Sequence, residues 1–321
     1  MQLKHPCILV VLCASAIGAQ APRATAAPEI FAPGVISGPA NDGAPTFTPD
    51  GKTLYFERTG GSWGFIMESH LRKGKWTNPV VAPFSGLWSD QQPDLSPDGT
   101  RLVFESSRPA IDSSGPGAPK AAPYANVLWE VRRTRTGWSE PVRLPATVNI
   151  SARVFKPSLA ADGSLYFMAK LDAAKTWRLY RSRYQDGAYQ QAEPLAFSDG
   201  NHTDVDPEIA PDQSFLIFSS AGRAAESDSH EHLYITFRAG DGWGPITPLR
   251  YAGDYDHNPA DDGEAQLSPD RHSLYFTSSR AAPIHANRTR AEAAKDFARL
   301  NLWDNSDNNV WVISLAPWLE G

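Results

Sequence analysis

The chain has 321 residues, of which 41% are hydrophobic, and a formal net charge of −6. Because nucleic acids and anionic membranes attract basic surfaces, a net negative chain excludes both as expected partners. Its two cysteines, Cys7 and Cys13, lie near the N-terminus, so a chain cleaved after them would have neither a disulfide nor a cysteine-ligated metal site.

The N-terminal residues predict a secretory signal over residues 1–26. Lys4 gives a short basic start, and residues 7–19 form an apolar run that is too short to span a membrane. Small residues at 24–26 form the expected cleavage site, with residues 16–18 as a second candidate. No later stretch is long and apolar enough to cross a bilayer. We therefore expect a periplasmic or secreted protein without a membrane span.

Five segments that share one pattern organise the rest of the chain, residues 27–321. They are residues 44–58, 92–108, 156–170, 206–223 and 264–280. Each has a short apolar run, a turn built on Pro-Asp-Gly or a close variant, and a second run of apolar and aromatic residues. The turn aspartates are 48 to 64 residues apart, and a Pro-, Gly- and Ser-rich insertion at 113–122 falls in the longest spacing. Regular repetition at this length is typical of propellers.

Each copy predicts a hairpin followed by two weaker strands. In the first copy, Pro49 fixes φ at the turn, Asp50 accepts hydrogen bonds from the turn backbone, and Gly51 supplies a positive φ. The third strand of that copy is expected at residues 65–67 and the fourth at residues 76–80. Four strands in each repeat make one propeller blade.

The predicted fold is all-β, a single five-bladed β-propeller of four-stranded blades, with six blades, one of them degenerate, as the alternative. The fifth copy runs out of chain soon after residues 310–315, and residues 30–35 look like its missing outer strand. We expect this N-terminal strand to close the ring, because closure removes an exposed sheet edge. Residues 289–302 are Ala-rich with apolar residues at helical spacing, which predicts a helical insertion in the last blade.

The repeat resembles the WD-like Pro-Asp repeat of TolB and of the propeller domains of prolyl oligopeptidase-type enzymes. The resemblance covers nearly the whole chain after the signal, and it implies a TolB-like β-propeller. TolB-like rings usually have six blades, whereas five copies occur here, and neither the extra α/β domain of TolB nor a hydrolase domain fits. One Gly-x-Ser-x-Gly match, residues 60–64, falls in a loop between strands instead of a strand-to-helix turn, so we interpret it as chance.

The innermost strand of each blade is expected to line the central channel, where alternate residues face inward. The residues directly before the shared Pro position are Ala44, Gln92, Lys156, Asp206 and Glu264. Those directly after it are Thr46, Asp94, Ser158, Glu208 and Gln266. All ten share one side of the pleat, so they face the channel, or pack between blades if the pleat is reversed.

Carboxylates in this set suggest catalysis, because two carboxyl groups can supply an acid and a base or nucleophile. The candidate catalytic residues are Asp94, Asp206, Glu208 and Glu264. Five-bladed glycoside hydrolases of the arabinanase type have a similar architecture, with acidic residues on separate inner strands at the channel mouth. The alternative is structural. Basic residues end every second strand, and aspartates stand three residues before the shared Pro position in four copies, so Arg–Asp pairs between blades would clamp the ring. The bases are Arg58, Arg108, Lys170, Arg223 and Arg280, and the aspartates are Asp42, Asp90, Asp204 and Asp262.

A ligand-binding interpretation rests on departures from the repeat. Charged residues stand in three copies where the first has only Ala44, and Arg153 lies next to the position where the other copies have Asp. With neighbouring amides, these residues predict a mixed-charge pocket for a polar ligand such as a sugar or a peptide terminus. Trp88 precedes the second inner strand and is a candidate for stacking on a sugar ring. The ligand-binding candidates are Gln92, Arg153, Lys156, Gln266 and Trp88.

Histidine and aspartate residues gather in the expected loops of the fourth and fifth repeats. The candidate metal ligands are His202, His230, His232 and His257, with Asp204 and Asp256 nearby. These side chains suit zinc or another divalent ion, and the acidic stretches also suit calcium. Their spacing matches no known zinc signature, so a divalent metal is the alternative to the expectation of no cofactor.

The function we predict is an exported binding or scaffold module for a protein partner or a polar ligand such as a carbohydrate. The repeat itself and the lack of a catalytic motif in a suitable context support this prediction. One alternative is a glycan-acting hydrolase that uses the channel carboxylates, and another is a metal-dependent, lactonase-like enzyme that uses the His and Asp loops. The sequence leaves open whether the protein is an enzyme.

Overall fold

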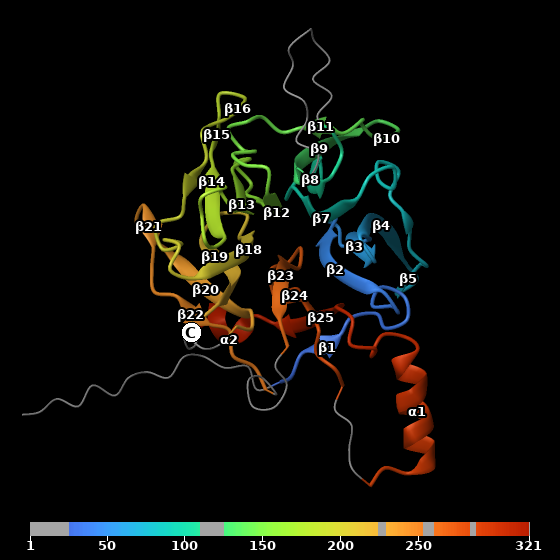
Figure 1. Cartoon of the computed structure of the whole chain (residues 1–321). Coiled ribbons are helices and arrows are strands. Elements are labelled where there is room, and N and C mark those ends of the chain that lie inside the picture. The colour runs from blue at the N-terminus through green and yellow to red at the C-terminus, as the bar shows by residue number, and fades with distance from the viewer. Residues whose placement is uncertain (1–25, 110–124, 224–228, 253–259, 283–286, 321) are drawn as a thin grey trace, which may run out of the picture.

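The computed structural model describes residues 26–109, 125–223, 229–252, 260–282 and 287–320. Within them, five sheets surround a central channel as the blades of a β-propeller (Figure 1). This confirms the predicted five-bladed, all-β fold, and the six-bladed alternative is wrong. The insertion at 113–122 and residues 1–25 of the predicted signal lie outside the described residues.

Each blade is a meander whose strands pair antiparallel from the channel outward. The inner strands are β2 (Asn41–Phe47), β7 (Asp90–Leu95), β12 (Val154–Leu159), β18 (Thr203–Ile209) and β23 (Asp262–Leu267). The second strands are β3 (Thr53–Gly60), β8 (Arg101–Ser106), β13 (Leu165–Ala169), β19 (Phe215–Ala221) and β24 (Ser273–Ser278). The third strands are β4 (Trp63–Arg72), β9 (Val127–Thr134), β14 (Arg178–Ser182), β20 (His232–Ala239) and β25 (Asn309–Ser314).

The outer edge of the first four blades consists of short strands that pair with the third strand. They are β5 (Lys75–Trp76) and β6 (Val80–Val81), β10 (Gly137–Trp138) and β11 (Val142–Arg143), β17 (Glu193–Pro194), and β21 (Gly242–Trp243) and β22 (Thr247–Pro248). Blade three adds a small hairpin of β15 (Tyr184–Gln185) and β16 (Ala188–Tyr189).

Blade five takes its outer strand from the N-terminus. The strand β1 (Glu29–Ile30) pairs antiparallel with β25, with Glu29 opposite Val312. The predicted closure of the ring is confirmed, but the strand is shorter than residues 30–35. It ends because Ala32 has a φ of 44°, which is incompatible with an extended strand.

The core lies in the five gaps between neighbouring blades, and each gap holds one cluster of buried apolar residues. Alternate residues of a strand point to opposite faces, and neighbouring blades cover both faces. In β3, Leu54 and Phe56 pack in the gap toward blade five, whereas Tyr55 packs in the gap toward blade two. Burial on both faces explains why the second strands are continuous apolar runs.

The helix α1 (Arg290–Leu300) lies between β24 and β25, where a helical insertion is predicted. Thr289 is its N-cap and forms a capping box with Glu292. No residue of α1 is buried, and Figure 1 shows the helix beside the ring instead of over the channel. A short helix, α2 (Ala316–Leu319), follows β25. No helix among the described residues is long and apolar enough to cross a membrane.

Candidate functional site

A β-bulge interrupts all five inner strands at the same point. The register of each inner strand shifts across the shared Pro position. The residue before that position has a positive φ of 42–52° in every blade, although none of the five is glycine. A bulge redirects the side chain that it carries. The five bulge residues are Ala44, Gln92, Lys156, Asp206 and Glu264.

The bulge residues meet around the channel. Gln92 Nε2 donates to Glu264 Oε1 at 2.9 Å, which joins blades two and five across the channel. Gln92 Oε1 accepts from the backbone N–H of Lys156, and Asp206 Oδ2 accepts from that of Glu264. The predicted channel-facing orientation is therefore observed for these side chains, and they link blades to one another.

The residues after the shared Pro position link the blades in a second layer. An inner strand is the edge of its sheet, so alternate N–H groups point away from its own blade and need an acceptor. In four of the gaps, a side chain of one blade accepts from a backbone N–H of the next at 2.7–3.0 Å. The acceptor and donor pairs are Thr46 and Leu95, Asp94 and Leu159, Ser158 and Ile209, and Glu208 and Leu267.

Two predicted catalytic residues, Asp94 and Glu208, thus accept hydrogen bonds from a neighbouring blade inside the ring. Asp94 is 2% exposed and Glu208 3% exposed. Burial raises the pKa of Asp94 to about 6 and that of Glu208 to about 8, and the Asp94 charge contributes to the rise at Glu208. Gln266 Nε2 also donates to Glu208 Oε1 at 3.1 Å.

Lys156 is fully buried between these layers. Its Nζ has no hydrogen-bond partner among the described residues. Its positive charge opposes the rise in the pKa of Asp94, Asp206 and Glu208. Lys156 therefore lies inside the ring as a counterion to the acids.

Carboxyl groups crowd the end of the channel where the inner strands begin. Besides Asp206 and Glu264, this end holds Glu57 of β3, Glu105 of β8 and Glu231, which immediately precedes β20. Burial, followed by the charge of Glu264, raises the pKa of Glu57 and Glu105 well above the usual range. The same causes raise the pKa of Asp206 to about 7. Burial and the charge of Asp206 raise the pKa of Glu231 to about 8.

Sequence reasoning missed Glu57, Glu105 and Glu231. A signal existed for the first two, because each follows the apolar run of its second strand at the same place in the repeat. Glu57 pairs with Gly43 and Glu105 with Gln91, which puts both beside the bulge. Glu231 has no equivalent signal, since only the ring brings it to the acids of other blades.

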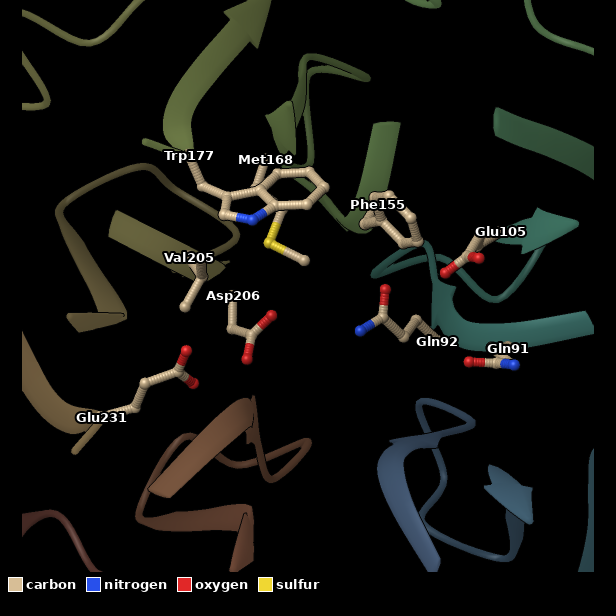
Figure 2. A pocket seen from close by; sticks show the side chains of 9 residues that line it. All are labelled: Gln91, Gln92, Glu105, Phe155, Met168, Trp177, Val205, Asp206 and Glu231. Carbon is tan, nitrogen blue, oxygen red and sulfur yellow. The ribbon is translucent and has the colours of Figure 1, made fainter. Parts of the chain in front are cut away.

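A cavity of about 310 Å³ opens at this end (Figure 2). Trp177, Phe155 and Met168 lie along one side of it, and Asp206 and Glu231 lie across from them. The remaining lining residues are Gln91, Gln92, Glu105 and Val205. A second cavity, of about 120 Å³, lies at the opposite end, near Asp94 and Glu208.

Of the five predicted ligand-binding residues, Gln92 lines the cavity of about 310 Å³, Gln266 lines the one at the opposite end, and Lys156, Trp88 and Arg153 line neither. Trp88 is 40% exposed and lines a separate cavity of about 680 Å³ with Phe84, Trp129 and Trp138 of blades one and two. The carbonyl oxygen of Arg153 accepts from Ser151 Oγ and from the backbone N–H of Lys170, and Arg153 does not line the channel cavity.

The predicted metal ligands do not come together among the described residues. No group of three or more His, Cys, Asp or Glu side chains is placed there to hold a metal ion. His230 Nδ1 lies 3.3 Å from Asp261 Oδ1 at the surface, whereas His232 is buried in β20. His257 and Asp256 lie outside the described residues.

Arg–Asp pairs are present in four blades, but each pair lies within one blade and not between blades as predicted. Their N···O distances are 2.6–2.9 Å. Three of the arginines also donate to a backbone carbonyl of the segment that arrives from the preceding blade. Blade three has Val154 in place of the aspartate. The pairs are Arg58 with Asp42, Arg108 with Asp90, Arg223 with Asp204, and Arg280 with Asp262.

Gly43→Ala is expected to destabilise the ring by roughly 1–3 kcal/mol. A Cβ at Gly43 would lie 2.4 Å from Glu264 Oε2 and 2.7 Å from Thr277 Oγ1. Thr277 donates to Glu264 at 2.8 Å, so the clash would break this contact. Urea unfolding measures the loss, with Gly60→Ala as the control, because no atom lies within 4 Å of a Cβ there. Equal stability of the two variants would contradict close packing at the channel.

Comparisons with known proteins identify the fold but no sequence family. No protein-family model and no curated protein matches the chain. A putative TolB from Agrobacterium tumefaciens superposes with a TM-score of 0.50 at 15% identity, covering 87% of this chain and 79% of that one. An α-L-arabinofuranosidase from Lactobacillus brevis superposes with a TM-score of 0.53 at 11% identity, covering 87% of this chain and 91% of that one.

A thermostable family-43 glycoside hydrolase is similar to the same degree. Its TM-score is 0.50 at 11% identity, and the match covers 86% of this chain and 89% of that one. At these identities the likeness concerns the fold alone, because one fold supports many functions. The TolB-like propeller fold expected from the repeat is thereby confirmed.

Proposed function

We propose that this TolB-like, five-bladed propeller is an exported binding module. Its site is the 310 Å³ cavity at the channel mouth, where it receives a polar ligand or a polar group of a protein partner. The observation that carries the proposal is the lining, which combines three carboxyl groups and two amides with the aromatic rings of Trp177 and Phe155. Such a mixture of apolar surface and a few polar groups is typical of ligand sites. The signal over residues 1–26 supports export.

The hydrogen bonds of the channel acids favour binding over catalysis. A general acid or base must reach its substrate. Asp94 and Glu208 are buried away from this cavity, and Glu264 accepts from Gln92 and Thr277. Asp206 is the predicted catalytic residue that lines the cavity. A glycan-acting hydrolase would therefore need Asp206 to act with Glu105 or Glu231.

A thermal-shift screen of the mature protein tests the proposal. The panel contains neutral sugars, sugar acids, amino acids, dipeptides and amines. A ligand at one hundred times its Kd adds about 2.7 kcal/mol of stability, and each kcal/mol raises Tm by roughly 2–4 °C in a large domain. We expect at least one class to raise Tm in the wild type and in Trp88→Ala, but not in Trp177→Ala.

Trp88→Ala is the matched control, since it removes a partly exposed tryptophan from a different cavity. Circular dichroism establishes that both variants are folded. If no class raises Tm, or if Trp177→Ala responds like the wild type, the channel mouth is not the site. If mass spectrometry detects a product released from a bound sugar, the protein is a glycan-acting hydrolase and the binding proposal is wrong.

A further inference from the structure

We propose that the ligand carries an ammonium group on an apolar body. The positive charge lies in the cavity that Glu105 lines at one end and Asp206 and Glu231 at the other, and the apolar part packs on Trp177 and Phe155 (Figure 2). This inference rests on the proposed function, because it names the ligand class of the same cavity.

The charges around the cavity favour a cation. Three of its lining residues are carboxylic acids and none is basic. Glu57 and Glu264 lie behind them, and the charge of Asp261 reaches Glu231. Lys156 is fully buried, and its charge offsets part of this negative charge at Asp206. Like charges at one site repel, and a bound cation would relieve this repulsion, whereas a neutral ligand would not.

Glu105 has one carboxyl oxygen without a hydrogen-bond partner among the described residues, although a hydrogen bond from the Asn126 side chain lowers the pKa of its carboxyl group. This residue is 3% exposed, and the oxygen is Oε2. Figure 2 shows its carboxyl group directed toward the cavity that it lines. Gln92, the nearby amide, donates from Nε2 to Glu264 and accepts at Oε1 from the backbone N–H of Lys156. Buried polar atoms are normally paired, so Oε2 points to a polar group of a ligand, and an ammonium group can donate to it when the carboxyl is ionised.

The opposite wall distinguishes an organic cation from a metal ion. Trp177 and Phe155 pack edge to face, with ring centroids 5.1 Å apart, and Met168 lies beside them. Aromatic faces attract organic cations and bind apolar groups, but they offer no oxygen ligands to a hard metal ion. A primary ammonium with an aromatic or aliphatic body would give N–H donors to the acids and apolar surface to Trp177 and Phe155.

The raised pKa of the acids adds a pH dependence to the proposal. Asp206, with a pKa of about 7, and Glu231, with a pKa of about 8, hold protons near neutrality because they are buried near Glu57, Glu264 and Asp261. A cation favours their charged forms, so binding should release protons. The affinity should therefore rise as the pH increases from about 6 to about 9.

Isothermal titration calorimetry on the mature protein tests the ligand class with a charge-matched pair of probes. Phenethylammonium is the cation and phenethyl alcohol its neutral counterpart. We expect the cation to bind at least about tenfold more tightly, because hydrogen bonds to charged groups are the stronger ones. Titrations in two buffers of different ionisation enthalpy measure the released protons. Acetyl-lysine amide, whose side-chain amine is free, is a third probe, since tighter binding of it would indicate a lysine on a protein partner.

Two isosteric variants locate the charge. Glu105→Gln and Glu231→Gln should each weaken cation binding at least about fivefold. Glu193→Gln, on an exposed outer strand of blade three, should leave it unchanged. Equal affinity for the two phenethyl probes, or unaltered binding in both cavity variants, would overturn the ammonium proposal. If sugars or acids bind and cations do not, the ammonium proposal is wrong, but the proposed binding site is supported. If nothing binds, both proposals fail.

Discussion

Asp90→Ala is expected to lower the free energy of unfolding by about 3–5 kcal/mol. Asp90 has no exposed surface, and Arg108 is 8% exposed. Both Asp90 oxygens accept from Arg108 Nη2, and Ser85 and Ser106 also donate to them. Alanine would leave the guanidinium buried without its counter-charge, and Arg108 Nη1 already has no hydrogen-bond partner among the described residues.

Urea unfolding of the purified variant measures this loss. The control is Glu193→Ala, whose partner Arg183 is 3.7 Å away in an exposed pair. Such a pair contributes about 1 kcal/mol at most. A double replacement, Asp90→Leu with Arg108→Met, removes both charges and should recover most of the stability. A loss below about 1 kcal/mol in Asp90→Ala would contradict a stabilising role of this pair.

The protein is expected to be more stable near pH 5 than near pH 8.5, with a Tm that falls by several degrees between them. In the folded chain the pKa is about 6 for Asp94, about 7 for Asp206, and about 8 for Glu208 and Glu231. In the unfolded chain these groups titrate near pH 4. Their protonated forms therefore favour the folded state. This contribution is complete below about pH 4 and is lost as the pH rises through the folded pKa values.

The turn aspartates act in the opposite direction. Hydrogen bonds lower the pKa of Asp50, Asp212 and Asp270, so their contribution is lost as the solution becomes strongly acidic. These groups are exposed or nearly so, which makes the contribution small. The stability maximum should therefore lie between about pH 4 and 6.

Glu208→Gln is the variant that tests the role of the channel acids. Glutamine retains an oxygen for the N–H of Leu267 but has no proton to release. Thermal unfolding across this pH range should show a weaker pH dependence in Glu208→Gln and an unchanged one in Glu193→Gln. A wild-type Tm that rises toward pH 8.5 would contradict the protonated state of the channel.

The sequence alone was sufficient to predict the blades, because the turns and strands that form a blade depend on residues close together in the sequence. Pro49, Asp50 and Gly51 form a turn in any context, and the flanking apolar runs fix the two strands of the hairpin. Repetition then gives the number of blades, and the unpaired fifth copy predicts closure by the N-terminal strand. The helix was also predictable, since Thr289 and Glu292 are three residues apart and begin an Ala-rich segment.

The burial and the hydrogen bonds of the channel acids depend on contacts that only the closed ring creates. Gln92 and Glu264 are 172 residues apart in sequence, and their contact exists because closure brings blades two and five to one channel. The bulges turn the side chains inward. Edge N–H groups of blades three and five bind Asp94 and Glu208, which the sequence presented as catalytic candidates. The sequence did not identify Glu105 and Glu231 as cavity residues either. Burial and hydrogen bonding depend on contacts between distant segments, whereas turns, strands and helix caps depend on neighbouring residues.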